Sequence, residues 1–437
     1  MGYFYQGGSL KVGTESAPSS ASVDIATLAR EFGTPLYIYD VSDVEMRYRA
    51  YVKALSGLNS SVHYALKANS NPLLLKKLAS WGAGVDTVSA GEIRKALAAG
   101  FAPAKIIFSG VAKTKKEIAF AIENQIKQIN VESPAELARI IELARAAGKK
   151  IDVAFRLNPD VNPQTHPYIT TGFRENKFGM DESFLPELMT LLQESKDAVR
   201  LRGLTMHIGS LLFDLAVFRE AIEKTIAVHR KFLAEGFVLD RLDVGGGLGI
   251  RYETADASSE LKLLEDFGVM VREVIEKNFG QEALLGGSRV PTLEILTEPG
   301  RMLVARSGLL VSEVQYIKRA PAKTFAIVDT GMHHILRPAL YQAKHRIVAL
   351  AQTPSSSAQG SPAIQSYDVV GPICESSDVL AKNVELPEIT AGDYLGVSDT
   401  GAYGFSMASA YNSHEFPREV LVENGSVTET PSARQRS

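Results

Sequence analysis

The residues of this chain that could do chemistry recur at the ends of short apolar runs. Lys67 follows YAL, Asp86 lies in GVDTV, and His207 lies in LTMHI. A lysine amine can form a Schiff base with an aldehyde, an acid can keep a facing heteroaromatic nitrogen protonated, and an imidazole can stack on such a ring. The other groups placed in this way are Glu92, Arg156, Ser210, Gly245-Gly246-Gly247-Leu248-Gly249 and Glu298-Pro299-Gly300-Arg301.

The stretch DVGGGLG adds a place for an anion. Glycines let backbone N–H groups approach a phosphate closely, and successive N–H groups form an anion-binding nest. A Schiff-base lysine, an acid for a ring nitrogen, a stacking imidazole and a phosphate loop together describe a site for pyridoxal 5'-phosphate. In this interpretation Lys67 holds the aldehyde, Glu298 faces the ring nitrogen and residues 245–247 hold the phosphate.

Each of these features also has an ordinary structural explanation. Lys67 could be a solvated side chain whose stem lies along apolar neighbours. His207 could be a hydrogen-bonded core histidine, DVGGGLG a tight turn and Arg301 a loop arginine. Loops on unrelated strands have no structural reason to collect all of these groups, so the set as a whole favours a functional site.

Eight short runs rich in β-branched residues alternate with helical patterns between residues 60 and 300, and these elements must position the polar groups. Strands that alternate with helices pair in parallel, and eight of them close into a (β/α)8 barrel with its functional groups at the carboxyl ends of the strands. An open doubly wound sheet is the alternative. The predicted strands are residues 61–66, 84–88, 105–109, 128–131, 151–157, 204–208, 241–245 and 293–297.

Outside this block the pattern is that of strands and turns. PLYIYD precedes the block, and SGLLVSEVQYIK, KTFAIVD, HRIVAL, YDVVG and DYLGVSD follow it. We therefore expect an α/β protein with a cofactor-binding barrel at 36–302 and a second, β-rich domain formed by 1–35 and 303–437. Its tail, residues 424–437, is expected to be disordered.

Composition narrows the range of partners. A formal net charge of -3 gives no basic surface for phosphate backbones, so nucleic acid is not expected. No stretch approaches the ~20 apolar residues of a membrane span, and no signal-peptide pattern opens the chain, so we expect a cytoplasmic protein that does not bind membranes. The single cysteine, Cys374, excludes a disulfide framework or a zinc site of several thiolates, and we expect no metal.

Seven short motifs, in this order, resemble one known family: YALKAN, HIGS, DVGGGLG, EPGR, RPALY (337–341), CES (374–376) and GAY (401–403). The chain is similar to the pyridoxal phosphate-dependent decarboxylases of fold type III, which have the alanine racemase fold. The resemblance runs from about residue 24 to about residue 422 and includes HPYITTGFRENKFG (166–179), which looks like a long loop of that family. It implies a homodimer with two active sites shared between subunits.

The resemblance also implies residue roles. Lys67, His207, Glu298 and Cys374 are the expected catalytic residues, with Cys374 as a proton donor that reaches the site across the dimer interface. Contacts to the far end of the substrate are expected from Arg301, Arg337, Tyr341, Glu375 and Tyr403. The expected cofactor-binding residues are Lys67, Asp86, Arg156, His207, Ser210, Gly245, Gly246, Gly247, Glu298, Gly300, Arg301 and Tyr403.

The choice of substrate depends on that far end. A dicarboxylic substrate needs a guanidinium fork, whereas ornithine presents a bare ammonium group. Arg301 and Arg337 favour the members of the family that decarboxylate meso-2,6-diaminopimelate, while Glu375 alone would serve either substrate. Decarboxylation of ornithine or arginine, racemisation, and cofactor binding without catalysis are the alternatives.

The chain departs from the family's usual sequence motifs near the expected site. It has Gly331-Met332-His333-His334 where relatives often have GMND, Ser377 in place of a glycine, Leu211 after HIGS, and YNSHEFP at 411–417. None of these changes removes an expected catalytic atom. Adjacent His333 and His334 would point to opposite faces if they were extended, so no shared metal site is expected.

Overall fold

The computed structural model describes residues 2–15, 21–161, 177–280, 293–351 and 364–431. The chain divides into two compact units. Unit 1 comprises residues 1–47, 251–257 and 303–437, and unit 2 comprises residues 48–250 and 258–302. Each unit therefore draws on segments that lie apart in the sequence.

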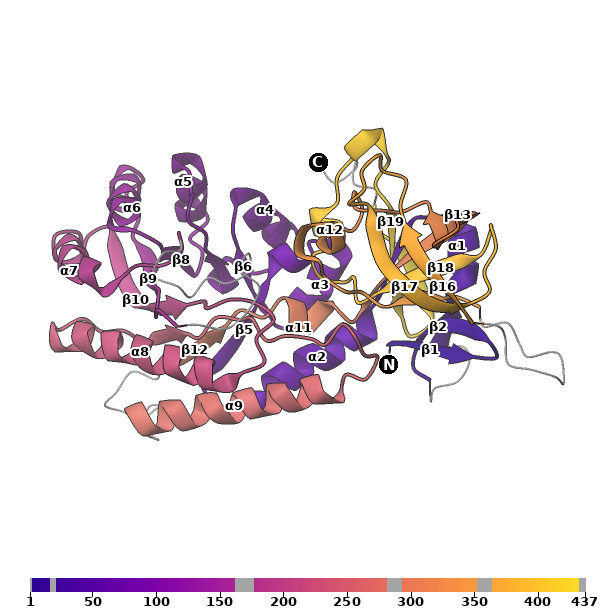
Figure 1. The fold of residues 1–437 in the computed structure, drawn as a ribbon. Helices are drawn as coiled ribbons and strands as arrows, with labels where there is room; N and C mark the ends of the chain where they lie inside the picture. The colour runs from indigo at the N-terminus through magenta and orange to yellow at the C-terminus, as the bar shows by residue number, and fades with distance from the viewer. Residues whose placement is uncertain (1, 16–20, 162–176, 281–292, 352–363, 432–437) are drawn as a thin grey trace. The chain divides into compact units, whose positions relative to one another are not determined.

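Unit 2 is a closed barrel of parallel strands in the order β10-β11-β12-β5-β6-β7-β8-β9 (Figure 1). All eight predicted runs are strands, so the predicted (β/α)8 barrel is confirmed and the open doubly wound sheet is wrong. The strands are β5 (Ser60–Ala65), β6 (Gly84–Thr87), β7 (Ile106–Phe108), β8 (Gln128–Val131), β9 (Ile151–Leu157), β10 (Val199–Met206), β11 (Arg241–Asp243) and β12 (Glu294–Thr297).

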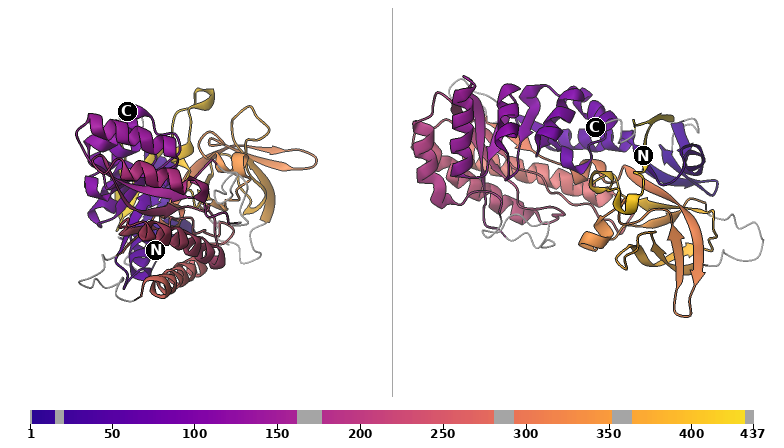
Figure 2. Two further views of the ribbon diagram at one scale, coloured as in Figure 1. Left: turned by 90° about the vertical axis from the view of Figure 1, so that its left-hand side faces the viewer. Right: turned by 90° about the horizontal axis from the view of Figure 1, so that it is seen from above.

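Helices cover the outside of the barrel strands (Figure 1, Figure 2). Several begin at a side chain that accepts a hydrogen bond from the first turn, as Ser89 does from the backbone N–H of Glu92. Thr114 and Glu117 form a capping box, which fixes the start of α5. The helices are α3 (Pro72–Ser80), α4 (Ala90–Ala98), α5 (Lys115–Glu123), α6 (Pro134–Ala146), α7 (Leu185–Gln193), α8 (Leu215–Ala234) and α9 (Ser258–Phe279).

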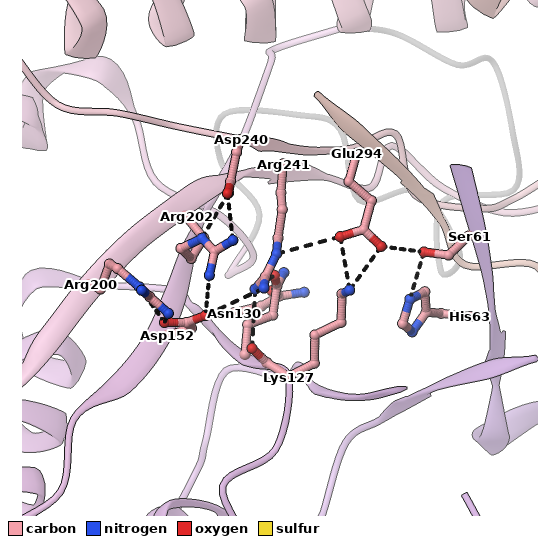
Figure 3. Close-up of polar contacts among 11 residues, drawn as sticks. Ser61, His63, Lys127, Asn130, Asp152, Arg200, Arg202, Asp240, Arg241 and Glu294 are labelled. Atoms are coloured by element: carbon pink, nitrogen blue, oxygen red, sulfur yellow. Dashed lines mark hydrogen bonds and ion pairs between the residues drawn. The ribbon is translucent and has the colours of Figure 1, made fainter. Parts of the chain in front are cut away.

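A network of charged side chains lies at the amino-terminal ends of the barrel strands (Figure 3). The carboxylate of Asp152 accepts from Arg202 at 2.8 Å and from Arg241 at 3.3 Å, and it also pairs with Arg200. On the other side of Arg241, Glu294 pairs with Lys127 at 2.8 Å. Partly buried charges are tolerated only when each has a partner, and this network pairs residues from five neighbouring strand starts.

Unit 1 is rich in β-structure, as the sequence predicts. Its larger sheet has the order β17-β16-β14-β13-β4-β19-β20, with β18 beside β13 and β15 beside β18, and β1-β2-β3 form a small second sheet. The strands are β1 (Gly2–Gln6), β2 (Ser9–Gly13), β3 (Ser22–Asp24), β4 (Leu36–Asp40), β13 (Gly308–Arg319), β14 (Thr324–Val328), β15 (Ile347–Ala349), β16 (Ile364–Val370), β17 (Val379–Pro387), β18 (Tyr394–Ser398), β19 (Arg418–Glu423) and β20 (Ser426–Glu429).

Helices are few in unit 1. Helix α1 (Ile25–Phe32) packs with the small sheet through Ile25, Leu28 and Ala29, which belong to one buried apolar cluster with Leu36 and Ile38 of β4. The remaining helices are α2 (Val41–Ala54) and α11 (Arg301–Val304), which each contain a boundary between the units, and the short α12 (Arg337–Tyr341).

Two parts of unit 1 differ from the predicted division of the chain. Strand β4 falls in the predicted barrel domain, which starts at residue 36, whereas it pairs antiparallel with β13 and parallel with β19 in the sheet of unit 1. The tail predicted to be disordered from residue 424 contains β20, which pairs with β19. Asn424 and Gly425 both have positive φ, 50° and 81°, and form the tight turn of this hairpin.

Among the described residues, no helix combines the length and the apolar content needed to cross a lipid bilayer. The expected cytoplasmic location stays a prediction.

Candidate active site

A cavity of about 120 Å³ lies at the carboxyl ends of the barrel strands. It brings together five of the residues that the sequence singles out, two from strands β6 and β9 and three from the segments directly after β5, β10 and β12. These five are Lys67, Asp86, Arg156, His207 and Glu298, and the rest of the lining is Val88, Ser109, Gly110, Asn130, Phe178 and Thr205.

Lys67 lies in the short helical turn η2 (Leu66–Ala68), directly after β5. Its neighbours Leu66 and Ala68 are buried, whereas Lys67 is exposed and lines the cavity. The turn is held from both sides, because the hydroxyl of Tyr64 donates to the carbonyl of Asn69 at 2.9 Å and the backbone N–H of Ala65 donates to the carbonyl of Pro299 at 3.0 Å. The lysine is therefore carried on a fixed segment of backbone.

The glycine-rich turn follows β11 and leaves no room for side chains. A Cβ on Gly246 would lie 2.1 Å from the carbonyl oxygen of Glu298, and one on Gly247 would lie 2.3 Å from that of Gly209. Gly245 and Gly247 also have positive φ, 69° and 112°, which side chains disfavour. The carbonyl of Gly245 accepts from Thr297 Oγ1 and from the backbone N–H of Glu298, both at 2.8 Å. Close approach of backbone to backbone thus joins this turn to the loop after β12.

His207 is joined to the same turn. Its Nδ1 accepts from the backbone N–H of Gly246 at 3.4 Å, which places the proton of a neutral ring on Nε2. Burial lowers the pKa of His207 well below its usual value, and the positive charges of Lys67 and Arg156 lower it further. The imidazole is therefore neutral at physiological pH and presents an uncharged ring face.

Three buried carboxyl groups form an acidic cluster at the site: Asp86, Asp243 and Glu298. Burial raises the pKa of Asp243 to about 7, and the negative charge of Asp86 adds to the effect. Burial raises the pKa of Glu298 well above its usual range, and the charge of Asp243 adds to the effect. Burial also raises the pKa of Asp86, although Lys67 opposes the shift. The cluster therefore holds protons that solvated carboxylates would release.

Arg156 is anchored rather than loose in the cavity. Its Nη1 donates to Glu132 Oε1 at 2.9 Å, and its guanidinium carbon lies 4.9 Å from the centre of the Phe178 ring. The other oxygen of Glu132 accepts from the backbone N–H of Gly179 at 2.8 Å. These contacts fix a positive charge on the cavity wall. The loop at 166–179 lies outside the described residues, except for 177–179.

Ser210 and Arg301 are in contact. The Arg301 guanidinium donates to Ser210 Oγ through Nη2 at 3.1 Å and Nε at 3.3 Å. Gly300 is buried beside them. Neither residue lines the cavity described above, so their predicted roles toward phosphate and substrate stay predictions.

Sequence reasoning did not single out several residues of the site. Ser109 and Asn130 line the cavity and come from the ends of β7 and β8, the two predicted strands to which no chemistry was assigned. Asp243 stands directly before the glycine-rich turn. Ser109 and Asn130 could have been found as polar side chains at the carboxyl ends of barrel strands. Asp243 could have been found as the acid of the motif DVGGG.

The remaining predicted residues belong to unit 1. Arg337 is only 2% exposed. Its Nη1 donates to His345 Nε2 at 2.7 Å, and its guanidinium carbon lies 4.5 Å from the centre of the Tyr252 ring. Tyr341 ends the same helix and is half-buried.

Glu375 and Cys374 are both exposed in unit 1. The hydroxyl of Tyr411 donates to Glu375 Oε1 at 2.6 Å, and Ser377 Oγ donates to Oε2 at 3.1 Å. Tyr403 has a φ of 58°, which is uncommon for an aromatic residue and indicates that its surroundings fix its conformation.

The two adjacent histidines are not extended. Residues 332–334 form a turn, and the rings of His333 and His334 lie 3.6 Å apart, so the expectation that they point to opposite faces does not apply. The His333 ring also lies 4.6 Å from that of His414. Two of the departures from the family pattern, GMHH and YNSHEFP, are thus in contact. Among the described residues, no group of three or more acidic, histidine or cysteine side chains is placed to hold a metal ion.

The site fits pyridoxal 5'-phosphate by its donors and its shape. The exposed amine of Lys67 suits an aldehyde, the turn at 245–247 offers backbone that only glycine can provide, and Asp86 Oδ1 is buried without a hydrogen-bond partner among the described residues. A buried acid at Glu298 suits a basic ring nitrogen.

The chain is similar in sequence and in structure to known proteins. The model of the pyridoxal-dependent decarboxylases, pyridoxal binding domain, matches residues 41–305. Diaminopimelate decarboxylase of Aquifex aeolicus is 40% identical over 93% of this chain and 90% of its own length, and that of Pseudomonas aeruginosa is 41% identical over 92% and 90%. The crystal structure of diaminopimelate decarboxylase from Helicobacter pylori complexed with L-lysine has a TM-score of 0.83 and 38% identity, over 93% of this chain and 95% of that chain.

Proposed function

The chain belongs to the family of pyridoxal-dependent decarboxylases, and we propose that it converts meso-2,6-diaminopimelate to L-lysine and carbon dioxide, the last step of lysine biosynthesis. The observation that carries this proposal is the identity of 40 to 41% with curated diaminopimelate decarboxylases over more than nine-tenths of the chain. The cavity of unit 2 adds physical support, because it gathers the amine, acids and imidazole that this chemistry uses.

Pyridoxal phosphate is held, in this proposal, by residues of the barrel. Lys67 Nζ is the amine for its aldehyde, the turn at 245–247 and Ser210 receive its phosphate, and Asp86 and Arg156 face its ring from the sides. When bound, the cofactor supplies a ring that accepts the electron pair left behind as carbon dioxide departs. Glu298 keeps the ring nitrogen protonated, and the neutral His207 ring packs on the ring face.

The far end of the substrate selects diaminopimelate over simpler diamino acids. Arg301 and Arg337 offer guanidinium groups to the second carboxylate, with Tyr341 and Tyr403 as further contacts. The guanidinium of Arg337 is already oriented by His345 and Tyr252, so little side-chain entropy is lost when it binds a carboxylate. Glu375 receives the far ammonium group.

Cys374 is our candidate for the acid that returns a proton to the substrate carbon. It is exposed, so it is available to another surface, and we propose that it serves the active site of a second copy of the chain in a homodimer.

A direct assay tests the function. The purified protein with pyridoxal phosphate is given meso-diaminopimelate, ornithine or arginine in separate reactions, and lysine and carbon dioxide are quantified while the visible absorbance is recorded. We expect one lysine for each carbon dioxide. Turnover of ornithine should be lower by roughly a hundredfold or more, because ornithine has no second carboxylate to accept hydrogen bonds from Arg301 and Arg337.

A preference for ornithine or arginine would instead assign the protein to the diamine-forming decarboxylases of the family. In that case the exposed Glu375 would bind the positively charged far end of the substrate. A coloured protein that releases no carbon dioxide from any of the three substrates would leave only cofactor binding.

A further inference from the structure

A column of polar side chains runs through the interior of the barrel, from the charged network at the strand starts to the acid Glu298. Arg241 Nη1 donates to Gln128 Oε1 at 3.1 Å, and Gln128 Nε2 donates to Asn130 Oδ1 at 2.9 Å. Asn130 Nδ2 then donates to Ser109 Oγ at 3.0 Å and to Glu298 Oε1 at 3.5 Å.

The members of the column are buried, and its first link joins Arg241 on β11 to Gln128 on β8, which are not neighbours in the barrel. Gln128 is 0% exposed and Asn130 is 1% exposed. They are two residues apart on β8, so their side chains point to the same face of the strand, which is the barrel interior. Buried amides of this kind are costly unless every donor and acceptor is satisfied.

The order of donors and acceptors along the column is set by Arg241 at one end. A guanidinium group has donors and no acceptor, so Arg241 can only face the oxygen of Gln128. With its oxygen facing Arg241, Gln128 can donate to the Asn130 oxygen only through its nitrogen. The Asn130 nitrogen then faces Glu298. The last oxygen in the series, Glu298 Oε1, is therefore obliged to accept.

Arg241 is itself held by charges outside the column. Its Nη2 lies 3.3 Å from Asp152 Oδ2 and its Nε lies 3.6 Å from Glu294 Oε2. These acids, which lie at the opposite end of the barrel from the cavity, keep the guanidinium in place.

Asp243 is the second group that acts on Glu298. Its Oδ1 accepts from the backbone N–H of Gly245 at 2.9 Å, and its negative charge raises the pKa of Glu298. The Glu298 carboxyl thus has an amide donor on Oε1 and a second acid nearby. A donor hydrogen bond favours the ionised form of a carboxyl group, whereas a neighbouring acid favours the protonated form.

We propose that Arg241, Gln128 and Asn130 are positioning residues, which form a one-way hydrogen-bond relay that holds Glu298 as an acceptor and so sets the protonation of the acid facing the cofactor ring. This inference rests on the proposed function for the identity of the ring that Glu298 faces. The relay itself is a property of the chain without cofactor and can be tested there.

The variant Gln128→Glu tests the relay with almost no change of shape. The new carboxylate still accepts from Arg241, but it cannot donate to Asn130, so the Asn130 amide turns its nitrogen toward residue 128 and its oxygen toward Glu298. Glu298 then loses a donor and gains an acceptor. Arg200→Gln, which alters the charged network without touching the column, is the matched control.

The measurement uses the full chain without cofactor and follows the infrared band of a protonated carboxyl group as the pH is changed. The band is assigned to Glu298 by its loss in the variant Glu298→Gln. We expect the midpoint of this band to rise by about one pH unit in Gln128→Glu and to stay unchanged in Arg200→Gln. With cofactor and substrate, kcat should fall by about tenfold while KM changes little, because the acid acts on the chemical step.

A second variant covers the case that Gln128→Glu does not fold. Asn130→Asp still accepts from Gln128 but places a carboxyl oxygen against Glu298, and it should raise the same midpoint. An unchanged midpoint in either folded variant overturns the relay. The shift is read without substrate, so a protein that shows the shift but releases no carbon dioxide contradicts the proposed function alone.

Discussion

At the scale of single residues, the cavity is lined by one exposed lysine whose neighbours in the chain are buried. Leu66 and Ala68 are both 1% exposed or less, so the turn that carries Lys67 cannot rotate without uncovering apolar surface. The backbone segment that carries the lysine is therefore fixed by packing on both sides of it, before any ligand binds.

Replacing Lys67 with alanine should abolish turnover and the visible absorbance of the bound cofactor, because no other described cavity residue is an amine. Absorbance spectra and lysine release measure the two effects. Lys95→Ala, which removes an exposed lysine hydrogen-bonded to Ser70, is the control and should behave as the unaltered protein. Residual turnover in Lys67→Ala would remove this residue from the mechanism.

Adding one methyl group to the glycine-rich turn should weaken cofactor binding. In Gly246→Ala the new Cβ would lie 2.1 Å from the Glu298 carbonyl oxygen, so the turn or the loop after β12 must move. We expect the affinity for pyridoxal phosphate to fall about tenfold or more, as measured by fluorescence titration. Gly91→Ala is the control, since its Cβ would meet Ser89 Oγ at 3.5 Å on helix α4, and normal affinity in Gly246→Ala would contradict the assignment.

Three of the residues that the sequence singles out, Lys67, His207 and Glu298, line the cavity, and their chemical roles stay predictions. Lys67, His207 and Glu298 could be found because their types and spacing are rare together. Asn130 and Gln128 could not, because an amide in an apolar strand acquires meaning only when its neighbours on other strands are known. Burial, which raises the pKa of Glu298, is likewise a property of the folded chain.

At the scale of elements, two loops of unit 1 are tied together by one acid. Asp378 accepts from the backbone N–H of Met332 at 2.6 Å and from that of Ile373 at 2.7 Å. A Cβ on Gly331 would lie 2.5 Å from Asp378 Oδ1, so the glycine of GMHH is needed for this approach. The segment with Cys374 and Glu375 is therefore shaped by the segment with the two histidines.

The histidine group makes the stability of the protein sensitive to acid. Burial and the neighbouring rings lower the pKa of His333 to about 4 and that of His334 to about 3. The unfolded chain therefore takes up protons first as the pH falls below about 6.5, and stability present above that pH is lost progressively toward pH 4.

His333→Phe, which keeps a ring of similar size, should reduce this loss. Thermal unfolding midpoints at pH 7.5 and pH 5 measure it, and we expect a smaller difference between the two midpoints in the variant than in the unaltered chain. An equal or larger difference would show that the His333 ring does not resist protonation.

The charged network at the amino-terminal end of the barrel should contribute more to the free energy of unfolding than its partial exposure suggests. Asp152→Asn leaves Arg202 and Arg241 without their shared carboxylate, and we expect it to cost about 2–4 kcal/mol in denaturant unfolding. The control Asp197→Asn breaks the exposed pair with Arg145 and should leave the unfolding midpoint nearly unchanged. Similar midpoints for both variants would contradict this role.

The elements themselves were predictable where a pattern repeats. The eight barrel strands follow one rule of alternation, and all were found. The hairpin of β19 and β20 has a strong turn signal in Asn424-Gly425, but the polar composition after residue 424 is equally typical of a disordered tail. Strand β4 was assigned to the neighbouring domain because its partners β13 and β19 lie far away in the sequence.

At the scale of the whole molecule, the proposed homodimer can be tested by mixing two inactive proteins. Lys67→Ala and Cys374→Ala, unfolded and refolded together, form heterodimers in which one site carries both changes and the other carries neither. If Cys374 acts across the interface, the mixture should recover about a quarter of the normal turnover. No recovery, with light scattering showing a dimer, would place Cys374 and Lys67 of one chain in the same site.

Strand β4 has a consequence for how the protein is made. All five of its residues are buried, and its partners are β13, which begins at Gly308, and β19, which begins at Arg418. On a translating ribosome, β4 leaves the exit tunnel long before either partner exists, while β5 to β12 can assemble behind it. A nascent chain that stalls before residue 418 thus displays an apolar strand with an open edge, which is a natural target for chaperones and for quality-control proteases.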